Sequence, residues 1–367
     1  MKFRTSLILL LLILSSTAVP AHADRRNDKI RGSKVERTIA ADPHVTVSAC
    51  SVSGIITVHG WDHNEVRVRS SEAAEIKFQR KDDGATASPV RKIELLILDK
   101  EQGPTQPGFC ESSSEIELYV PRSATVQLRT RDSDISVFEV ATAYVNTQNG
   151  DVTIERATTA VEAGSISGSI SLKDSSGRIN LHSAGGNIEA DHVRPADAGD
   201  TFEARTLGGE ITLDHVAHAQ LSAHTLNGSL SVSGPLVHSG RYNLRTMSGD
   251  MTLSLPEDSS FQLSARFSQK AEIITDFPIT LTPTPRAMPS PPAAPVVVAP
   301  VPPAANHAPR PDPPSKKDAP DVVAKVKTKV LIDVSGVTLR RIEGVHGSGD
   351  AKLELASFSG TIHLQKQ

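Results

Sequence analysis

A glycine recurs at a fixed place in a repeating pattern of apolar residues, and this repeat constrains the fold of the chain more than any other feature. Successive copies are 18 to 23 residues apart, at Gly150, Gly168, Gly186, Gly209, Gly228 and Gly249. Apolar side chains stand two and four residues after each glycine, and again seven and five residues before it. Alternation with a period of two on both sides of a small residue predicts two short strands per unit. We therefore expect an all-β fold, a β-solenoid or β-helix-like stack with about 18–23 residues per rung.

A hydroxyl residue stands three residues before every one of these glycines. The column reads Thr147, Ser165, Ser183, Thr206, Thr225 and Thr246. The same register returns at two distant places, around Gly54 and around Gly360, and a unit in which Ser133 replaces the glycine precedes Gly150. The N-terminal and C-terminal parts of the chain are therefore predicted to belong to one stack.

The first 23 residues have the pattern of a secretory signal peptide. Lys2 and Arg4 precede an apolar run over residues 7–14, and Ala21-His22-Ala23 has the small-x-small form of a signal peptidase site. We expect a mature chain that begins at Asp24, lies in the periplasm or at the cell surface, and has no transmembrane segment.

Composition divides the rest of the chain. Fifteen of the 24 prolines lie in residues 278–320, and proline blocks strand pairing, so we expect a disordered insertion there. The predicted parts are an exposed lead-in over 24–44, a strand-repeat domain over 45–277 (an irregular cap at 45–122 and regular rungs at 123–277), the insertion at 278–320, and C-terminal rungs of the same stack over 321–367.

The chain has two cysteines, Cys50 and Cys110, and export would bring both into an oxidising compartment. A disulfide that closes the N-terminal region is one interpretation. Two separate buried thiols are the other, because the sequence does not fix the distance between them.

Four segments of the repeat, TQNGDVTI, TLGGEITL, TMSGDMTLSLP and ASFSGTIHL, resemble the repeats of the bacterial "putative adhesin" β-strand-repeat family. The resemblance covers about residues 45–277 and the last 30 residues. It implies a β-helix-like fold outside the cytoplasm and a role at the cell surface or envelope. The resemblance implies no catalytic residues.

An outward-facing column four residues before the glycine is rich in basic side chains. Its basic members are Arg129, His182, Arg205, His224 and Arg245. They are candidates for binding an anionic envelope polymer, an acidic glycan or a lipid head group; the alternative is a solvated strand face. The net charge of −3 and the absence of a basic block argue against nucleic acid as a partner.

Two units share a histidine string in the same register, Asp191-His192-Val193 and Asp214-His215-Val216, and His218 follows. Histidines one rung apart, with aspartate beside them, are a candidate transition-metal site made of His192, His215 and His218. The alternative is two copies of one turn sequence. The sequence predicts no cofactor.

The sequence contains no G-x-S-x-G, H-E-x-x-H, P-loop or dinucleotide-binding glycine motif. We therefore expect a non-enzymatic adhesin-like protein that binds or scaffolds at the cell envelope through its outward strand faces. The alternative is a polysaccharide-active β-helix lyase or hydrolase, which needs a cleft of converging carboxylates. An envelope protein remains a further candidate partner.

Overall fold

The structure, a computed structural model, describes residues 34–70, 74–81, 89–99, 115–268, 271–282, 328–329 and 339–367. The predicted signal peptide lies outside the described residues, as does the predicted insertion from residue 283 onward. Residues 278–282 are described and contain the paired strand Thr280–Leu281, so the disorder predicted for this first part of the insertion is wrong. Within the described ranges the chain forms β-strands and turns and no helix.

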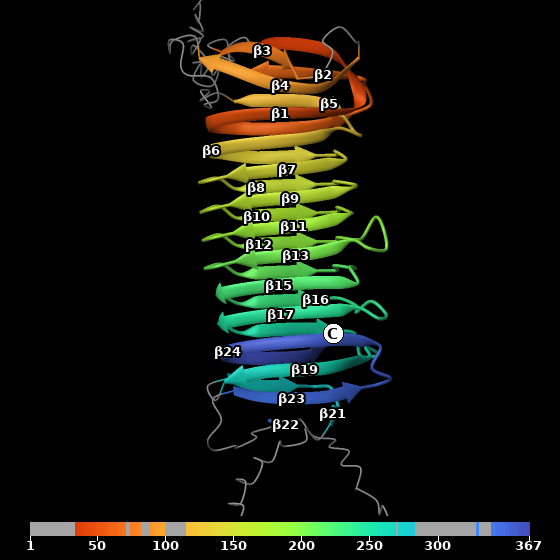
Figure 1. Cartoon of the computed structure of the whole chain (residues 1–367). Helices are drawn as coiled ribbons and strands as arrows, with labels where there is room; N and C mark the ends of the chain where they lie inside the picture. The colour runs from red at the N-terminus through yellow and green to blue at the C-terminus, as the bar shows by residue number, and fades with distance from the viewer. Residues whose placement is uncertain are drawn as a thin grey trace, which may run out of the picture.

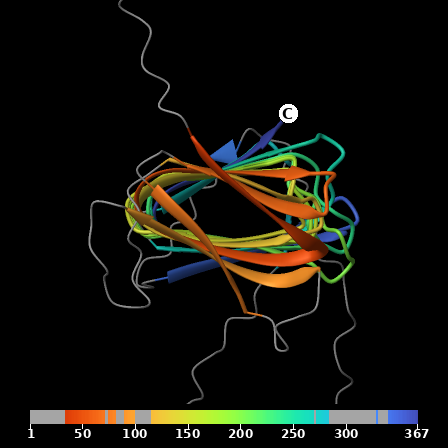
Figure 2. The ribbon, with the colours of Figure 1, turned by 90° about the horizontal axis from the view of Figure 1, so that it is seen from above.

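The strands stack one above another along a single axis (Figure 1). Viewed along that axis, they form a flattened ring (Figure 2). The described residues form 24 strands of one hydrogen-bonded sheet. The predicted all-β solenoid is therefore confirmed.

Each regular rung consists of a first strand and a second strand, and each strand pairs in parallel with its counterparts one rung away. The first strands are β7 (Thr142–Thr147), β9 (Ala160–Ser165), β11 (Arg178–Ser183), β13 (Thr201–Thr206), β15 (Gln220–Asn227), β17 (Arg241–Ser248) and β19 (Phe261–Ser268). The second strands are β8 (Val152–Glu155), β10 (Ile170–Lys173), β12 (Ile188–Asp191), β14 (Ile211–Asp214), β16 (Leu230–Ser233), β18 (Met251–Leu255) and β20 (Ala271–Thr275).

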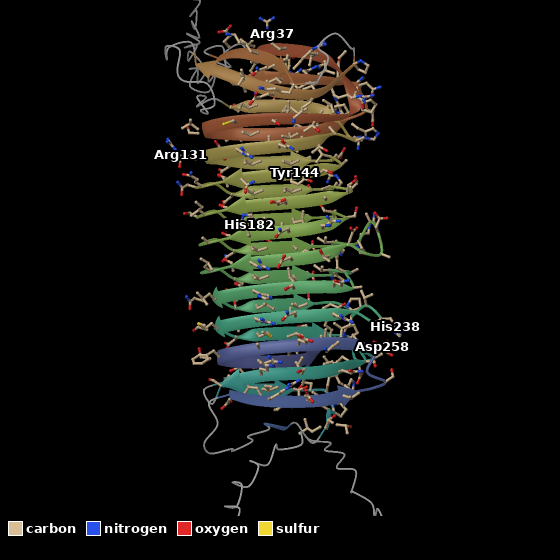
Figure 3. The ribbon with its side chains drawn as sticks, viewed as in Figure 1. Arg37, Arg131, Tyr144, His182, His238 and Asp258 are labelled. Carbon is tan, nitrogen blue, oxygen red and sulfur yellow. The ribbon has the colours of Figure 1, made fainter. Side chains whose placement is uncertain are left out.

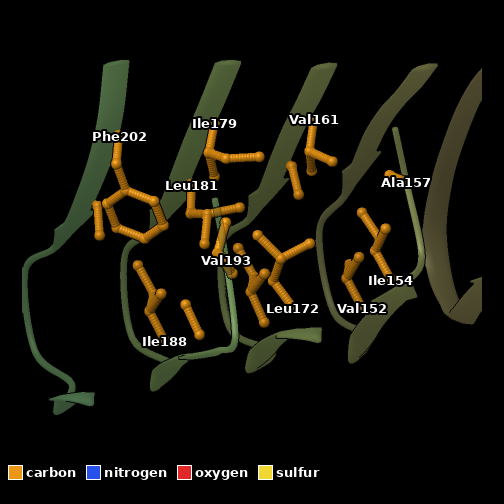
Figure 4. Close-up of a cluster of buried hydrophobic side chains, with 14 of the residues drawn as sticks. Val152, Ile154, Ala157, Val161, Leu172, Ile179, Leu181, Ile188, Val193 and Phe202 are labelled. Carbon is orange, nitrogen blue, oxygen red and sulfur yellow. The ribbon is translucent and has the colours of Figure 1, made fainter. Parts of the chain in front are cut away.

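The core is a narrow interior filled by the inward residues of both strands. Ile170 pairs with Val152 on one side and Ile188 on the other, so identical positions form continuous apolar columns. Figure 4 shows Ile179, Leu181 and their neighbours from successive rungs pointing into this interior. Burial of an aliphatic side chain contributes about 1.5–3 kcal/mol, and the repeated register gives every rung that contribution.

The glycine and hydroxyl columns make the close turn between the two strands. A Cβ at Gly168 would clash with the backbone carbonyl of Gly150, one rung earlier, and the same clash recurs along the glycine column. Ser165 Oγ donates to the carbonyl of Gly150 at 3.2 Å and accepts the amide of Gly168 at 2.8 Å. The repeated glycine is thus required by close approach between rungs, and the hydroxyl satisfies the backbone groups of the turn.

The N-terminal end is covered by longer and partly antiparallel strands. β1 (Val35–Trp61) makes a full rung and pairs in parallel with β6 (Thr125–Phe138). Around it lie β2 (Glu65–Ser70), β3 (Ala74–Arg80), β4 (Val90–Asp99) and β5 (Ile116–Pro121).

The lead-in predicted over residues 24–44 is a strand from Val35 onward, although most of its side chains there are exposed as predicted. Residues from Val35 to Ala40 pair with β2, and Ala41 is buried. The antiparallel partner was not visible in the repeat pattern, and it covers a strand edge that would otherwise be open at the end of the stack.

The C-terminal end departs from sequence order. β24 (Ala351–Lys366) pairs on one side with β17 and β18 and on the other with β19 and β20. It therefore occupies a rung inside the stack, between rungs that are consecutive in the sequence (Figure 1). The last rung is followed by antiparallel β23 (Leu339–His346), by β21 (Thr280–Leu281), which pairs with β23, and by β22 (Thr328–Lys329), which pairs with β20.

Candidate functional site

Part of the predicted basic stripe forms a continuous column on the outward face of the first strands. Arg205 pairs in register with His224, and His224 with Arg245. Beyond Arg245, β24 contributes Ala356, and the following strands contribute Arg266 and Arg341. We refer to Arg205, His224, Arg245, Arg266 and Arg341 as the basic column.

Of the other two residues predicted for the stripe, Arg129 lies apart from this group, and His182 is next in register to Arg205. Arg129 belongs to β6, and Asn146 and Gly164 separate it from His182. His182 pairs with Arg205 in the backbone register, but its imidazole lies over Gly164, where a Cβ would clash with it. Figure 3 shows the outward side chains along the stack, His182 and Tyr144 among them. The stripe is therefore concentrated toward the C-terminal rungs.

A column of exposed apolar side chains runs beside the basic column. Its members follow the buried hydroxyl residue of each first strand, and we refer to them as the apolar column. They are Leu207 (58% exposed), Leu226 (39%), Met247 (52%) and Phe358 (53%). Ile166 has the same place two rungs before Leu207, but Ala184 stands between them. Sequence reasoning missed this column, although the position two residues before each glycine carried the signal.

The two columns line a shallow groove with a volume of about 480 Å³. Arg205, His224, Arg245 and Arg266 form its basic side, and the apolar column forms the other. A second cavity of about 550 Å³ continues along the strands around Arg245, Arg266 and Arg341. Apolar contact and positive charge are thus offered together over several rungs.

The carboxylates along this face are paired with basic side chains. Glu203 pairs with Arg205, Glu343 pairs with Arg341, and Lys352 donates to Glu354 at 2.7 Å. The hydrogen bond from Lys352 holds the pKa of Glu354 below its usual value.

His224 lies half-buried between two arginines. Burial is the main cause that lowers the pKa of His224, and the charges of Arg245 and Arg205 lower it further. Ser222 Oγ lies 2.9 Å from its Nε2. The positive charge of the column therefore comes mainly from its arginines.

The predicted histidine cluster is only partly assembled. The rings of His192 and His215 stack with centroids 4.9 Å apart and an interplanar angle of 9°. Asp191 Oδ1 lies 2.6 Å from His192 Nδ1, and Asp214 Oδ1 lies 2.9 Å from His215 Nδ1.

The inclusion of His218 in that cluster is wrong. Its side chain is fully buried beside Phe202, and its Nε2 lies 2.8 Å from the carbonyl oxygen of Gly177. Burial lowers the pKa of His218. Val216 is buried, Ala217 is exposed and His218 is buried, so His218 points into the interior, away from the exposed His215.

A family model described as Toastrack DUF4097 matches residues 56–271, which is more than half of the chain. The chain belongs to the Toastrack DUF4097 family. The predicted resemblance to adhesin-like β-strand-repeat proteins is confirmed by this match. The regular rungs and much of the basic column fall within the Toastrack DUF4097 region; Arg341 and β24 lie after it. No curated protein matches the chain.

Three solved structures are similar to this Toastrack DUF4097 chain at low identity. A "putative adhesin" from Parabacteroides distasonis is 11% identical, with a TM-score of 0.38, over 62% of this chain and 91% of its own. A "putative cell adhesion protein" from Clostridium sporogenes is 10% identical, with a TM-score of 0.19, over 91% of this chain and 100% of its own. A "putative adhesin" from Parabacteroides merdae is 13% identical, with a TM-score of 0.28, over 62% and 90%. Sequence identities and TM-scores this low do not indicate a function.

A further prediction for the Toastrack DUF4097 chain concerns its two cysteines. Cys50 lies in β1, where it pairs in register with Arg129, whereas Cys110 lies outside the described residues. The disulfide between them stays a prediction.

Nothing helical in the described part of the chain has the length and hydrophobicity of a membrane span.

Proposed function

We propose that this protein is an exported, non-enzymatic, adhesin-like protein that attaches to an anionic, phosphate-bearing lipid of the bacterial envelope. The attachment surface is the groove between the basic and apolar columns. Its place of action is the periplasm or the cell surface, in keeping with the predicted signal peptide.

The observation that carries this proposal is the adjacency of the two columns. Guanidinium groups bind phosphate or carboxylate oxygens through paired hydrogen bonds. Removal of the apolar column from water stabilises a complex by about 25 cal/mol per Å² of apolar surface buried. A contiguous exposed apolar patch bordered by charge is typical of an interaction surface. A hydrophilic acidic polysaccharide would use only the arginines, whereas a phospholipid head group with its adjoining acyl chain uses both columns.

The non-enzymatic part of the proposal is supported by the pairing of Glu203, Glu343 and Glu354 with basic partners. General acid–base cleavage of a glycosidic bond needs two carboxylates facing one bond. A screen of polysaccharides for new reducing ends or unsaturated products is expected to be blank.

Co-flotation with vesicles tests the binding. The protein should float with phosphatidylcholine vesicles that contain phosphatidylglycerol, should float less as salt is added, and should not float with phosphatidylcholine alone. The double variant Arg205→Glu/Arg245→Glu should bind at least about tenfold more weakly, because two charges that face the head group are reversed. Lys173→Glu, which makes half of that change in charge on a second strand, is the control and should bind as the wild type does.

Two outcomes would overturn the proposal. Absence of flotation with anionic vesicles at low ionic strength would exclude the lipid. Retention on an immobilised acidic polysaccharide without vesicle binding would show that the arginines serve a glycan instead.

A further inference from the structure

Two consecutive corners of the stack place an aspartate–histidine pair in the same position. Asp191 and Asp214 end their second strands in register, and the next residues, His192 and His215, both have positive φ, at 52° and 49°. Because the two corners have the same backbone conformation, the histidine side chains superpose one rung apart. The stacked rings, with centroids 4.9 Å apart, follow directly from that geometry.

Each imidazole is oriented by a carboxylate. Asp191 and Asp214 face the Nδ1 atoms of His192 and His215, respectively. Asp214 also accepts a hydrogen bond from Ser233 Oγ in the next rung, which holds its carboxylate in place. Histidines that bind metals commonly have their other ring nitrogen held by a carboxylate, the place that Asp214 takes for His215, whereas Asp191 is itself a candidate ligand.

The ligand atoms of Asp191, His192 and His215 all lie within 4.8 Å of one another. Two atoms bound to one zinc ion are at most about 4 Å apart, since each bond is about 2.0–2.2 Å long. The groups must therefore approach by roughly an ångström. The histidine side chains are 59% and 49% exposed, so rotation about their side-chain bonds meets little packing.

We propose that Asp191, His192 and His215 form a surface site for a borderline divalent transition metal such as Zn²⁺, with Asp214 orienting His215. Two imidazole nitrogens and one carboxylate oxygen favour Zn²⁺, Ni²⁺ or Cu²⁺ over Ca²⁺ and Mg²⁺, which prefer oxygen ligands. Three protein ligands leave a coordination position for water or for a group from a partner. The site lies at the corner after the second strand, away from the groove, and does not depend on the proposed lipid binding.

Calorimetric titration of the untagged full chain with Zn²⁺, together with the visible spectrum of the Co²⁺ form, tests the site. We expect one saturable ion per chain. His192→Asn and His215→Asn should each weaken Zn²⁺ binding at least about tenfold and change the Co²⁺ spectrum, since each removes a ligand. Asparagine is suitable because it tolerates positive φ, so the corner keeps its backbone conformation.

His238→Asn is the matched control. His238 is 80% exposed, and its Nδ1 lies 3.8 Å from Asp350, so it is an aspartate-paired histidine outside the stacked pair. This variant should bind Zn²⁺ as the wild type does. No saturable Zn²⁺ or Co²⁺ binding by the wild type would overturn the proposal, as would unchanged binding by His192→Asn and His215→Asn with native unfolding curves.

Discussion

The two outward faces of the stack have the same backbone register and different chemistry. The first strands carry the basic and apolar columns over the C-terminal rungs. The second strands carry short hydroxyl side chains at the equivalent outward positions, Thr153, Ser171, Thr212, Ser231 and Thr252, with Glu189 among them. The backbone register of the solenoid therefore determines where the columns lie. The residue types in each column determine which face can bind a partner.

The inward columns contrast with both faces, because they hardly vary in chemistry. Ile170, Ile188, Ile211 and Leu230 occupy one such column, and each is at most 1% exposed. The core is thin and filled by apolar side chains, so a polar group placed there would not be hydrated. Substitutions at inward positions should therefore act on folding, and outward ones on binding.

The largest expected effect comes from a charge placed in the core. Ile211→Asp should lower the free energy of unfolding by about 4 kcal/mol or more, because an unpaired carboxylate would enter the apolar interior. Ser231→Asp, an outward residue of the next rung with the uncharged partners Thr212 and Thr252, should change it by at most about 0.5 kcal/mol. Urea unfolding of both variants measures the difference. Equal stability of the two would mean that the assigned inward register is wrong.

A smaller loss of stability should follow from filling the glycine column. Gly186→Ala would bring a Cβ against the backbone carbonyl of Gly168, and such overpacking costs about 1–3 kcal/mol. Gly199→Ala is the control, because no atom lies within 4 Å of a Cβ at that position. Thermal unfolding compares the two. A native midpoint for Gly186→Ala would contradict the close approach of neighbouring rungs.

The apolar column can be separated from the arginines by substitution. Leu207→Ser/Met247→Ser should weaken binding to anionic vesicles about tenfold while leaving its salt dependence intact, because apolar contact is lost and charge is kept. Ile166→Ser is matched in exposure but lies beside Gly164 and away from the arginines. It should bind like the wild type in the same flotation assay. If both variants lost binding equally, the groove would not be the specific surface.

The smallest effect concerns His224 and pH. Because its pKa is lowered in the folded state, the unfolded chain takes up a proton first as the pH falls below about 6.5, and the free energy of unfolding decreases. His224→Gln should reduce the loss of stability between about pH 7.5 and about pH 5, measured by urea unfolding. An undiminished loss in His224→Gln would show that the histidine is not shielded by its surroundings.

The sequence predicted more of the fold than of the candidate site. Alternation around Gly168 identified the inward residues, and the positions of Arg205, His224 and Arg245 followed from the same register. The exposed apolar column has the same periodicity, since its members stand two residues before the glycine, but it was not predicted. The separation of His218 from His192 and His215 depends on the left-handed corner at His215, after which Val216 and His218 alternate into the interior.

The sequence by itself determined the period, the glycine and hydroxyl columns and the two-strand rung, since these depend on contacts between equivalent residues of neighbouring units. Only the tertiary structure decided the order of the rungs at the C-terminal end, where β24 enters between β17 and β19 and places Ala356 between Arg245 and Arg266. The physical reason is that every rung offers the same parallel hydrogen-bonding edge. Local alternation therefore defines how a rung pairs without specifying which rung lies beside it.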